Sequence, residues 1–295
     1  MIFERQRLLL ALLAANGGGL DKLDFQKMLF LYTQTCEQEP SYEFVPFKKG
    51  CYSFTSVADK TKLADKGFLV ESEDWQLTDT GLKAARVPAD VAAKLNTFSE
   101  RRKHLRGESL VAHTYRQHPY WATRSHIAET VLKEDAAALA AIEHARPVRT
   151  SSKLWSIGYE GRSLEGYLNA LLRAGVSLLC DVRKNPLSRK YGFSKKTLSL
   201  VCSELDLRYE HLPQLGIESE ERQDLNGLAD YQALFNRYEQ TVLVKESAAL
   251  DRIAAWVKDG ESVAVTCYER LPDYCHRTRV ARTVEKLIGA KAADL

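Results

Sequence analysis

The spacing of apolar residues predicts two helices at the start of the chain. The first runs from about residue 3 to residue 15 and ends at Gly17-Gly18-Gly19, because consecutive glycines break a helix. The second has one apolar stripe at spacings i, i+3, i+4 and i+7, made of Phe25, Met28, Leu29 and Tyr32. A helix with one apolar face packs against a core, so both helices belong to a folded module.

A polar helix over residues 56–66 follows, and then residues 68–70 and 75–81 indicate a two-stranded wing. Two helices, a polar helix and a hairpin occur in this order in a winged helix-turn-helix, so we expect a winged-helix-like module over residues 1–86. Such modules bind DNA or protein, and we expect this one to bind DNA. The basic residues that the polar helix can present to a major groove are Lys60, Lys62 and Lys66.

Residues 87–149 form a predicted helical, basic linker region. It holds the densest basic run of the chain, Ser99-Glu-Arg-Arg-Lys-His-Leu-Arg, which is either a solvated face or a phosphate-contacting surface. Aromatic residues interleaved with bases favour contact with nucleic acid. These residues are Tyr115, His118, Tyr120, Trp121 and Arg124.

From Leu154 onward, short apolar runs alternate with amphipathic helical patterns. The runs at residues 154–158, 176–180, 207–212 and 262–266 predict strands. Helical stripes follow Ser163 and Ser194, which are good N-cap residues. Strands that alternate with helices predict an α/β domain over residues 150–295, with a mainly parallel sheet and helices on both faces.

Composition narrows the class of protein. The 295-residue chain is long enough for two modest cores, and its net charge of +3 leaves any nucleic-acid contact to local clusters. Six scattered cysteines are not a secreted disulfide framework. No apolar stretch reaches the roughly 18 residues of a membrane helix. We therefore expect a cytoplasmic protein with no membrane contact.

Charged and aromatic side chains follow the predicted strands at their carboxyl ends, where open parallel sheets bind ligands. The first strand is followed by Tyr159, Glu160 and Arg162. The second is followed by Asp181, Arg183 and Lys184, with Arg189 and Tyr191 beyond them. The third leads to His211, and the fourth leads to Tyr268, Glu269, His276 and Arg277. Four strands that end in this way predict one polar site.

Four segments around these positions carry a family resemblance. They are Ser156-Ile-Gly-Tyr-Glu-Gly-Arg-Ser, Cys180-Asp-Val-Arg-Lys-Asn-Pro, Arg208-Tyr-Glu-His-Leu-Pro-Gln-Leu-Gly, and Cys267-Tyr-Glu with Cys275-His-Arg. Together they are similar to the bacterial family known as domain of unknown function 488, from about Leu154 to Ile288. The N-terminal part more loosely resembles winged-helix-like regions of prokaryotic regulators and defence proteins. Members with such a front end resemble the DNA glycosylases of anti-phage defence, which implies removal of a modified base from phage DNA.

Cysteine chemistry is less well supported by the sequence. A phosphate-binding cysteine loop has an arginine six residues after its nucleophile, and here Pro186, Asp273 and Ala281 stand at those positions. A cysteine activated by His276 remains open. Metal ligands are available at Cys180, Cys267, Cys275 and His276, but their spacing is unlike the paired knuckles of zinc sites. We therefore expect neither a metal nor another cofactor.

Hydrolysis of an N-glycosidic bond builds positive charge on the sugar and needs carboxylates beside it. Asp181 and Glu269 are the candidate pair, one for charge stabilisation and one for acid–base work, and Tyr159 is a third catalytic candidate. We expect duplex DNA with one flipped base, stacked on aromatic rings, as the partner. The predicted substrate-binding residues are Glu160, Arg162, Arg183, Lys184, Arg189, Tyr191, His211, Tyr268, His276 and Arg277.

Alternatives remain open at this point. A metal-dependent nuclease would hold a divalent ion with Asp181, Glu269 and Glu160. A DNA-binding regulator would use the α/β domain to sense a ligand without turnover. Individual residues also have structural interpretations: Asp181 and Arg183 can form a structural ion pair, Glu269 can pair with Arg270 or Arg277, and His276 can cap the last helix.

Overall fold

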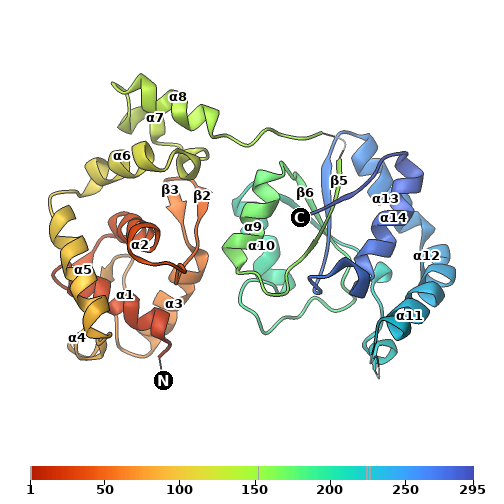
Figure 1. Cartoon of the computed structure of the whole chain (residues 1–295), viewed down its shortest axis with the longest axis horizontal. Coiled ribbons are helices and arrows are strands. Elements are labelled where there is room, and N and C mark those ends of the chain that lie inside the picture. Colours follow the sequence, from red (N-terminus) through yellow and green to blue (C-terminus); the bar gives the residue numbers. More distant parts are fainter. Residues whose placement is uncertain (1, 152, 224, 226) are drawn as a thin grey trace. The chain divides into compact units, whose positions relative to one another are not determined.

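The computed structural model describes residues 2–151, 153–223, 225 and 227–295, and it divides into two compact units between Arg146 and Pro147 (Figure 1). Each unit has its own core. The predicted linker region 87–149 is not a separate body, because Leu95, Phe98 and Leu110 belong to the core that the N-terminal helices form. Residues 147–151 follow the division and contain no helix or strand, as expected of a linker, and residue 152 is outside the described residues.

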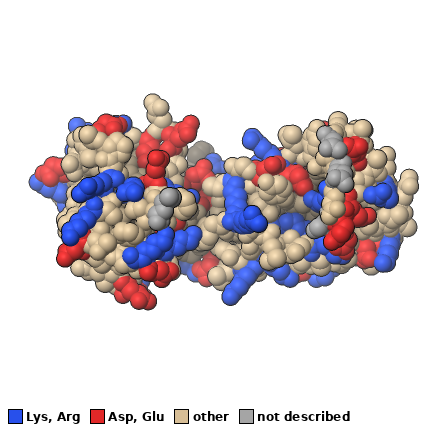
Figure 2. Space-filling view, turned by 90° about the horizontal axis from the view of Figure 1, so that it is seen from below, with Lys and Arg blue, Asp and Glu red and all other residues tan. Residues whose placement is uncertain are grey.

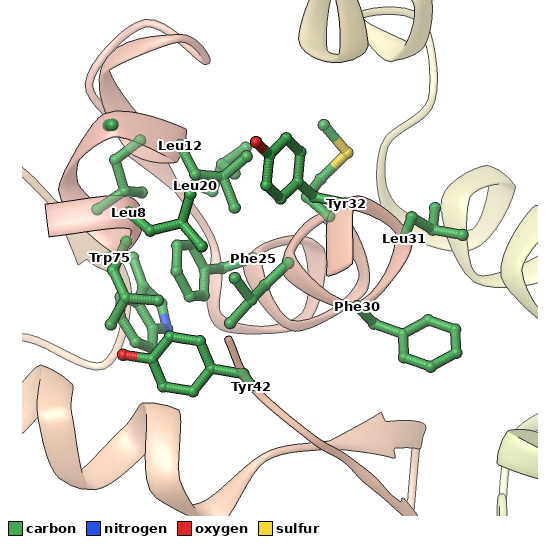
Figure 3. Close-up of a cluster of buried hydrophobic side chains, with 14 of the residues drawn as sticks. Leu8, Leu12, Leu20, Phe25, Phe30, Leu31, Tyr32, Tyr42 and Trp75 are labelled. Atoms are coloured by element: carbon green, nitrogen blue, oxygen red, sulfur yellow. The ribbon is translucent and has the colours of Figure 1, made fainter. Parts of the chain in front are cut away.

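The first unit is mainly helical. Its helices are α1 (Glu4–Ala14), α2 (Lys22–Cys36), α3 (Phe54–Asp65), α4 (Asp79–Ala84), α5 (Ala89–Arg102), α6 (Gly107–Gln117), the 3-10 helix η1 (Pro119–Ala122), α7 (Ala128–Val131) and α8 (Ala136–His144). Helix α2 begins at Asp21, whose carboxylate accepts hydrogen bonds from two backbone N–H groups of the first turn. The core packs around α2, where Phe25 stacks on Trp75 with ring centroids 3.6 Å apart (Figure 3).

Two short antiparallel pairs complete this unit. Strand β1 (Gly19–Leu20) pairs with β4 (Trp75–Gln76), and β2 (Val45–Phe47) pairs with β3 (Gly50–Tyr52). The second wing strand, predicted over residues 75–81, is shorter than expected. It pairs as far as Leu77, because the Thr78 side chain accepts from the Gly81 N–H and caps α4 instead. The winged-helix interpretation stays a prediction.

The second unit confirms the predicted α/β fold. Its five-stranded sheet has the order β7-β6-β8-β5-β9, and every pair is parallel. The strands are β5 (Lys153–Gly158), β6 (Leu178–Asp181), β7 (Arg208–His211), β8 (Ser262–Cys267) and β9 (Ala293–Asp294). All six residues of β8 are buried, as a central strand covered on both faces requires.

Helices cover both faces of the sheet (Figure 1). One face carries α9 (Leu164–Arg173) and α10 (Lys195–Glu204), and the other carries α11 (Leu228–Gln240), α12 (Val242–Lys245), α13 (Ser247–Lys258) and α14 (Arg277–Ile288). Ser163 caps α9 as predicted, whereas the Ser194 hydroxyl bonds to Ser188 and makes no capping bond to α10. The chain runs from β6 to β7 on one side of the sheet and from β8 to β9 on the other, so the connections diverge between β6 and β8. Parallel sheets bind ligands at such a point.

No helix in the described part of the chain is both long and apolar enough to cross a bilayer.

Gly81 gives a test of the packing of the first unit. A Cβ atom at Gly81 would overlap the carbonyl oxygen of Phe68, whereas one at Gly19 would make ordinary contacts with its neighbours. Alanine is the better helix former by about 1 kcal/mol, so propensity alone predicts that Gly81→Ala in α4 stabilises the protein. We expect the opposite, a loss of about 2 kcal/mol from overpacking.

The measurement is urea unfolding of the full chain, with Gly19→Ala in the paired strand β1 as the matched control. A Gly81→Ala protein as stable as the parent would show that the Phe68 carbonyl does not lie where we describe it.

Candidate metal centre

Four potential metal ligands converge beyond the carboxyl end of β8. Cys267 ends the strand, Glu269 follows it, and Cys275 and His276 lie directly before α14. One donor atom from each residue lies within 4.8 Å of the other three. The Cys267 Sγ lies 3.3 Å from the Glu269 Oε2 and 3.6 Å from the His276 Nδ1, and the Cys275 Sγ lies 2.9 Å from the same Oε2. Ligand atoms around a tetrahedral zinc ion are about 3.3–3.8 Å apart, so the donors need little movement to hold one.

The loop that joins these ligands is fixed by buried Arg277. Its guanidinium donates to the Ser156 hydroxyl of β5 and to the backbone carbonyls of Glu269 and Arg270. The loop can approach β5 this closely because residue 158 is glycine, where a Cβ would overlap the Glu269 carbonyl. Arg277 was predicted to bind substrate, but it is 1% exposed and its role is structural.

His276 is oriented as a ligand. Its Nε2 lies 3.0 Å from the backbone oxygen of Val182, and its Nδ1 lies 2.8 Å from an Arg222 nitrogen. A guanidinium only donates hydrogen bonds, so Nδ1 must be the acceptor and Nε2 must carry the proton. The lone pair of Nδ1 therefore points into the cluster, and a backbone carbonyl holds the other nitrogen, as in most histidines that bind metals.

Arg222 supplies the positive charge of the cluster. It comes from the 3-10 helix η3 (Ser219–Arg222) and donates to the Glu269 Oε1 at 2.7 Å. Glu269 thus pairs with Arg222 and not with Arg270 or Arg277, the partners that we considered from the sequence. The stretch around Arg222 has no strand-end signal, so sequence analysis missed it.

The close packing shifts the acid–base behaviour of the cluster. Burial alone raises the pKa of the Cys267 thiol, but a hydrogen bond with Cys275, together with His276 and Arg222, holds that pKa well below its usual value. Burial and the neighbouring Cys267 raise the pKa of Cys275. Burial, and then the charge of Cys267, also raise the pKa of Glu269. The pKa values of the two thiols are therefore shifted in opposite directions.

The members of the cluster differ in their exposure to solvent. Cys267, Cys275 and His276 are at most 2% exposed, whereas the Glu269 side chain is 16% exposed. Tyr268, beside it in the chain, is 46% exposed. Glu269 and Arg222, whose side chain is 31% exposed, are therefore the members of the cluster that a small molecule can reach from solvent.

Asp181 belongs to a different network. Its fully buried carboxylate accepts hydrogen bonds from the Arg183 Nε at 2.9 Å and from the Tyr209 hydroxyl at 2.6 Å, and it pairs with a second Arg183 nitrogen at 2.5 Å. Burial alone lowers the pKa of Arg183, but the pairing with Asp181 outweighs it and raises that pKa. The structural ion pair is therefore the correct interpretation. Because Asp181 is fully buried, it cannot line an open pocket together with the partly exposed Glu269, which corrects the expectation that the two carboxylates face one pocket.

Tyr159 also lies inside this second network. Its ring stacks on Phe193 with centroids 4.3 Å apart, and its hydroxyl accepts from Arg183 at 3.0 Å. The residue is 3% exposed. It therefore covers the end of the sheet, and neither Tyr159 nor Phe193 presents a free face to a flipped base.

The remaining predicted residues are spread around the same edge. Glu160 accepts from the Arg270 N–H, Arg162 donates to the Leu295 carbonyl, and Lys184 pairs with Glu218. His211 contacts the Arg183 carbonyl and Lys195, which places it against the Asp181 network. The predicted substrate-binding residues with exposed side chains are Glu160, Lys184, Arg189, Tyr191 and Tyr268.

The fold and its site define the second unit as a parallel α/β domain with a buried cluster of thiols, an imidazole and a carboxylate. Residues 163–284 match the family described as "Domain of unknown function DUF488", so this part of the chain is a domain of that family, as the sequence motifs indicated. No curated protein matches the chain.

The ion pair predicts a stability effect without a chemical role. Asp181→Asn keeps the shape of the side chain but leaves the buried Arg183 without its counter-charge, so we expect the free energy of unfolding to fall by about 3–5 kcal/mol. Asp251→Asn makes the same change on an exposed part of α13 and should cost less than about 0.5 kcal/mol.

Urea unfolding of both variants and of the parent is the measurement. Equal stability of Asp181→Asn and Asp251→Asn would mean that the carboxylate is free and available for chemistry.

Proposed function

We propose that the second unit is a zinc-dependent hydrolase domain, in which Cys267, Cys275 and His276 hold the ion. The observation that carries this proposal is the convergence of four donor atoms within 4.8 Å at the ligand-binding edge of the sheet. Thiolates and imidazole suit zinc, whereas magnesium and calcium prefer oxygen ligands. The proposal departs from the expectation of a site without a metal.

Glu269 supports a catalytic centre over a purely structural one. Its Oε2 faces the thiols while its Oε1 bonds to Arg222. Arg222 therefore holds this carboxylate independently of the thiols, so Cys267, Cys275 and His276 would hold the ion and Glu269 would stand beside it as an acid–base group. A zinc ion held by three protein ligands would supply a bound water whose pKa is lowered to about 7.

Arg222 contacts both a candidate ligand and the candidate acid–base group. Its bond to the His276 Nδ1 uses the lone pair through which His276 would hold an ion, so this bond and the ion would compete. Its bond to the Glu269 Oε1 would not compete with an ion. Arg222 would thus keep the carboxylate in place and supply a positive charge beside it.

DNA is the substrate that we propose. An exposed aromatic ring, Tyr268, lies next to Glu269 in the chain and can stack on a base. On the face drawn in Figure 2, Lys and Arg groups are interrupted by Asp and Glu. This mixture suits local contacts to a few phosphates better than a long continuous track. Hydrolysis of an N-glycosidic bond, the leading hypothesis from the sequence, now depends on Glu269 without Asp181.

Metal content gives the first test. We expect the purified chain to bind about one zinc ion, and cobalt in its place should show the absorption bands of thiolate-to-metal charge transfer. Cys275→Ser should weaken these bands and lower the affinity for zinc, because one of two sulfur ligands is lost. Cys36→Ser removes a thiol of the first unit and is the matched control.

A protein that binds no zinc or cobalt, or a Cys275→Ser variant with unchanged affinity, would contradict the metal centre.

The bond that is cleaved gives the second test. Duplexes with modified and unmodified bases are incubated with the zinc-loaded protein and then treated with alkali. We expect alkali-labile abasic sites in the modified duplex, lost in Glu269→Gln and after chelation of zinc. Direct strand scission would identify a nuclease. Bound zinc without any turnover would favour the DNA-binding regulator.

A further inference from the structure

The first unit contains a second candidate site, a cavity of about 460 Å³. This volume lies within the range of roughly 300–1,000 Å³ that is typical of small-molecule sites. The cavity lies between the start of α2, the β2–β3 hairpin, α3 and β4. Five lysines and one glutamate are among its lining residues: Lys22, Lys27, Lys48, Lys49, Lys60 and Glu73. We call it the lysine pocket.

Lys27 is the unusual member of the lysine pocket. It is 1% exposed, and its ammonium donates to the backbone carbonyl of Cys51 at 3.1 Å. No carboxylate of the described residues lies within ion-pair distance of it. Burial therefore lowers the pKa of Lys27. The Cys51 thiol is its second polar neighbour. An ammonium group has three N–H donors, so a buried lysine whose partners are the carbonyl and the thiol of one residue keeps a donor for a ligand.

Two other lysines of the pocket, Lys22 and Lys60, have more complete sets of partners. Lys22 pairs with Glu73, and Lys60 donates to the carbonyls of Ser72 and Glu73. Lys60 was predicted to face a DNA groove, but its ammonium is held against this loop. The positive charge that lacks a counter-charge is therefore concentrated at buried Lys27, with exposed Lys49 at the rim.

The body of the pocket is apolar and aromatic. Phe47 and Tyr52 from the hairpin lie with ring centroids 4.8 Å apart, and both line the cavity together with Leu23 and Val57. Both rings are half-buried, so part of each faces the cavity. Aromatic rings beside a buried cation suit a ligand that is planar at one end and negatively charged at the other.

We propose that the lysine pocket binds a nucleotide, with the aromatic base against Phe47 and Tyr52 and the phosphate at Lys27. The ligand supplies the counter-charge that Lys27 lacks, which explains why a charged side chain is retained at a buried position where an apolar residue would cost less. A free mononucleotide and the phosphorylated end of a nucleic acid strand offer the same chemistry. This inference is independent of the metal centre, because it rests on other residues in the other unit.

The test is a titration of the full chain with each probe, measured by isothermal titration calorimetry. The probes are the mononucleotides AMP, GMP, CMP and TMP, a tetranucleotide with and without a 5′-phosphate, and inorganic phosphate. Lys27→Met keeps the length of the side chain and removes its charge, and Lys83→Met makes the same change on exposed α4. We expect Lys27→Met to weaken nucleotide binding by about tenfold or more, since a hydrogen bond to a charged group is lost, and Lys83→Met to bind like the parent.

Each result decides the proposal. Binding of mononucleotides supports a free ligand, and binding of the 5′-phosphorylated tetranucleotide alone supports a strand end. If inorganic phosphate binds as tightly as the nucleotides, the proposed contact of the base with Phe47 and Tyr52 is wrong. If no probe binds, the proposed nucleotide site is wrong. Urea unfolding shows that Lys27→Met is folded, because loss of an unpaired buried charge should not destabilise the unit. A folded Lys27→Met that binds like the parent would also overturn it.

Discussion

The geometry of the second unit depends on one buried guanidinium, that of Arg277. It is placed at the start of α14, and it connects β5, through Ser156, to the loop that follows β8. The potential ligands lie on both sides of this connection, with Cys267 and Glu269 before the loop and Cys275 and His276 after it. Without this connection, the loop would be free to move away from the sheet and the four donor atoms would separate. Helix packing alone does not fix them, because none of the four lies inside a helix.

Buried or half-buried cations recur in this protein, and each is compensated in a different way. Arg183 has a carboxylate with two bonds, Arg222 has a carboxylate and an imidazole, and Arg277 has three neutral oxygens. Lys27 has only neutral partners on one residue, the carbonyl and the thiol of Cys51. A buried charge is costly unless it is paired and hydrogen-bonded, so the degree of compensation distinguishes a structural cation from one that awaits a ligand. By this criterion Arg183 and Arg277 are structural, and Lys27 is the best candidate for binding.

The sequence predicted the α/β fold well, because its signals are local. The strand at residues 262–266 is a nearly continuous apolar run, and Ser163 marks the start of α9 by a bond that spans three residues. Short elements without a local signal were not predicted. Strand β9, for example, has two residues and is defined by its pairing with β5. The pairing of β1 with β4 joins residues that are far apart in the chain, so no local pattern could indicate it.

The candidate site was harder to predict because burial, not residue type, decides what each side chain does. An aspartate two residues before an arginine looks the same in a sequence whether the pair is buried or free, and Asp181 proved to be fully buried. The thiols and His276 were recognised as possible ligands and set aside because zinc knuckles place their cysteines close together in sequence. Here Cys267 and Cys275 belong to opposite ends of a loop, and they come together through bonds that no local pattern indicates, above all those of Arg277.

The ion pair and the ligand cluster are nonetheless connected through one strand end. Asp181 is the last residue of β6, and the carbonyl of the next residue, Val182, fixes the ring of His276. The bonds of Asp181 to Arg183 and Tyr209 hold this strand end in register, so they also set the position of the carbonyl that orients His276. The buried acid thus contributes to the candidate metal centre by positioning a ligand, although its own oxygens take no part in binding. The end of β6 thus belongs to both networks. Asp181 and Glu269 therefore lie in connected parts of the structure although they do not act together as a catalytic pair.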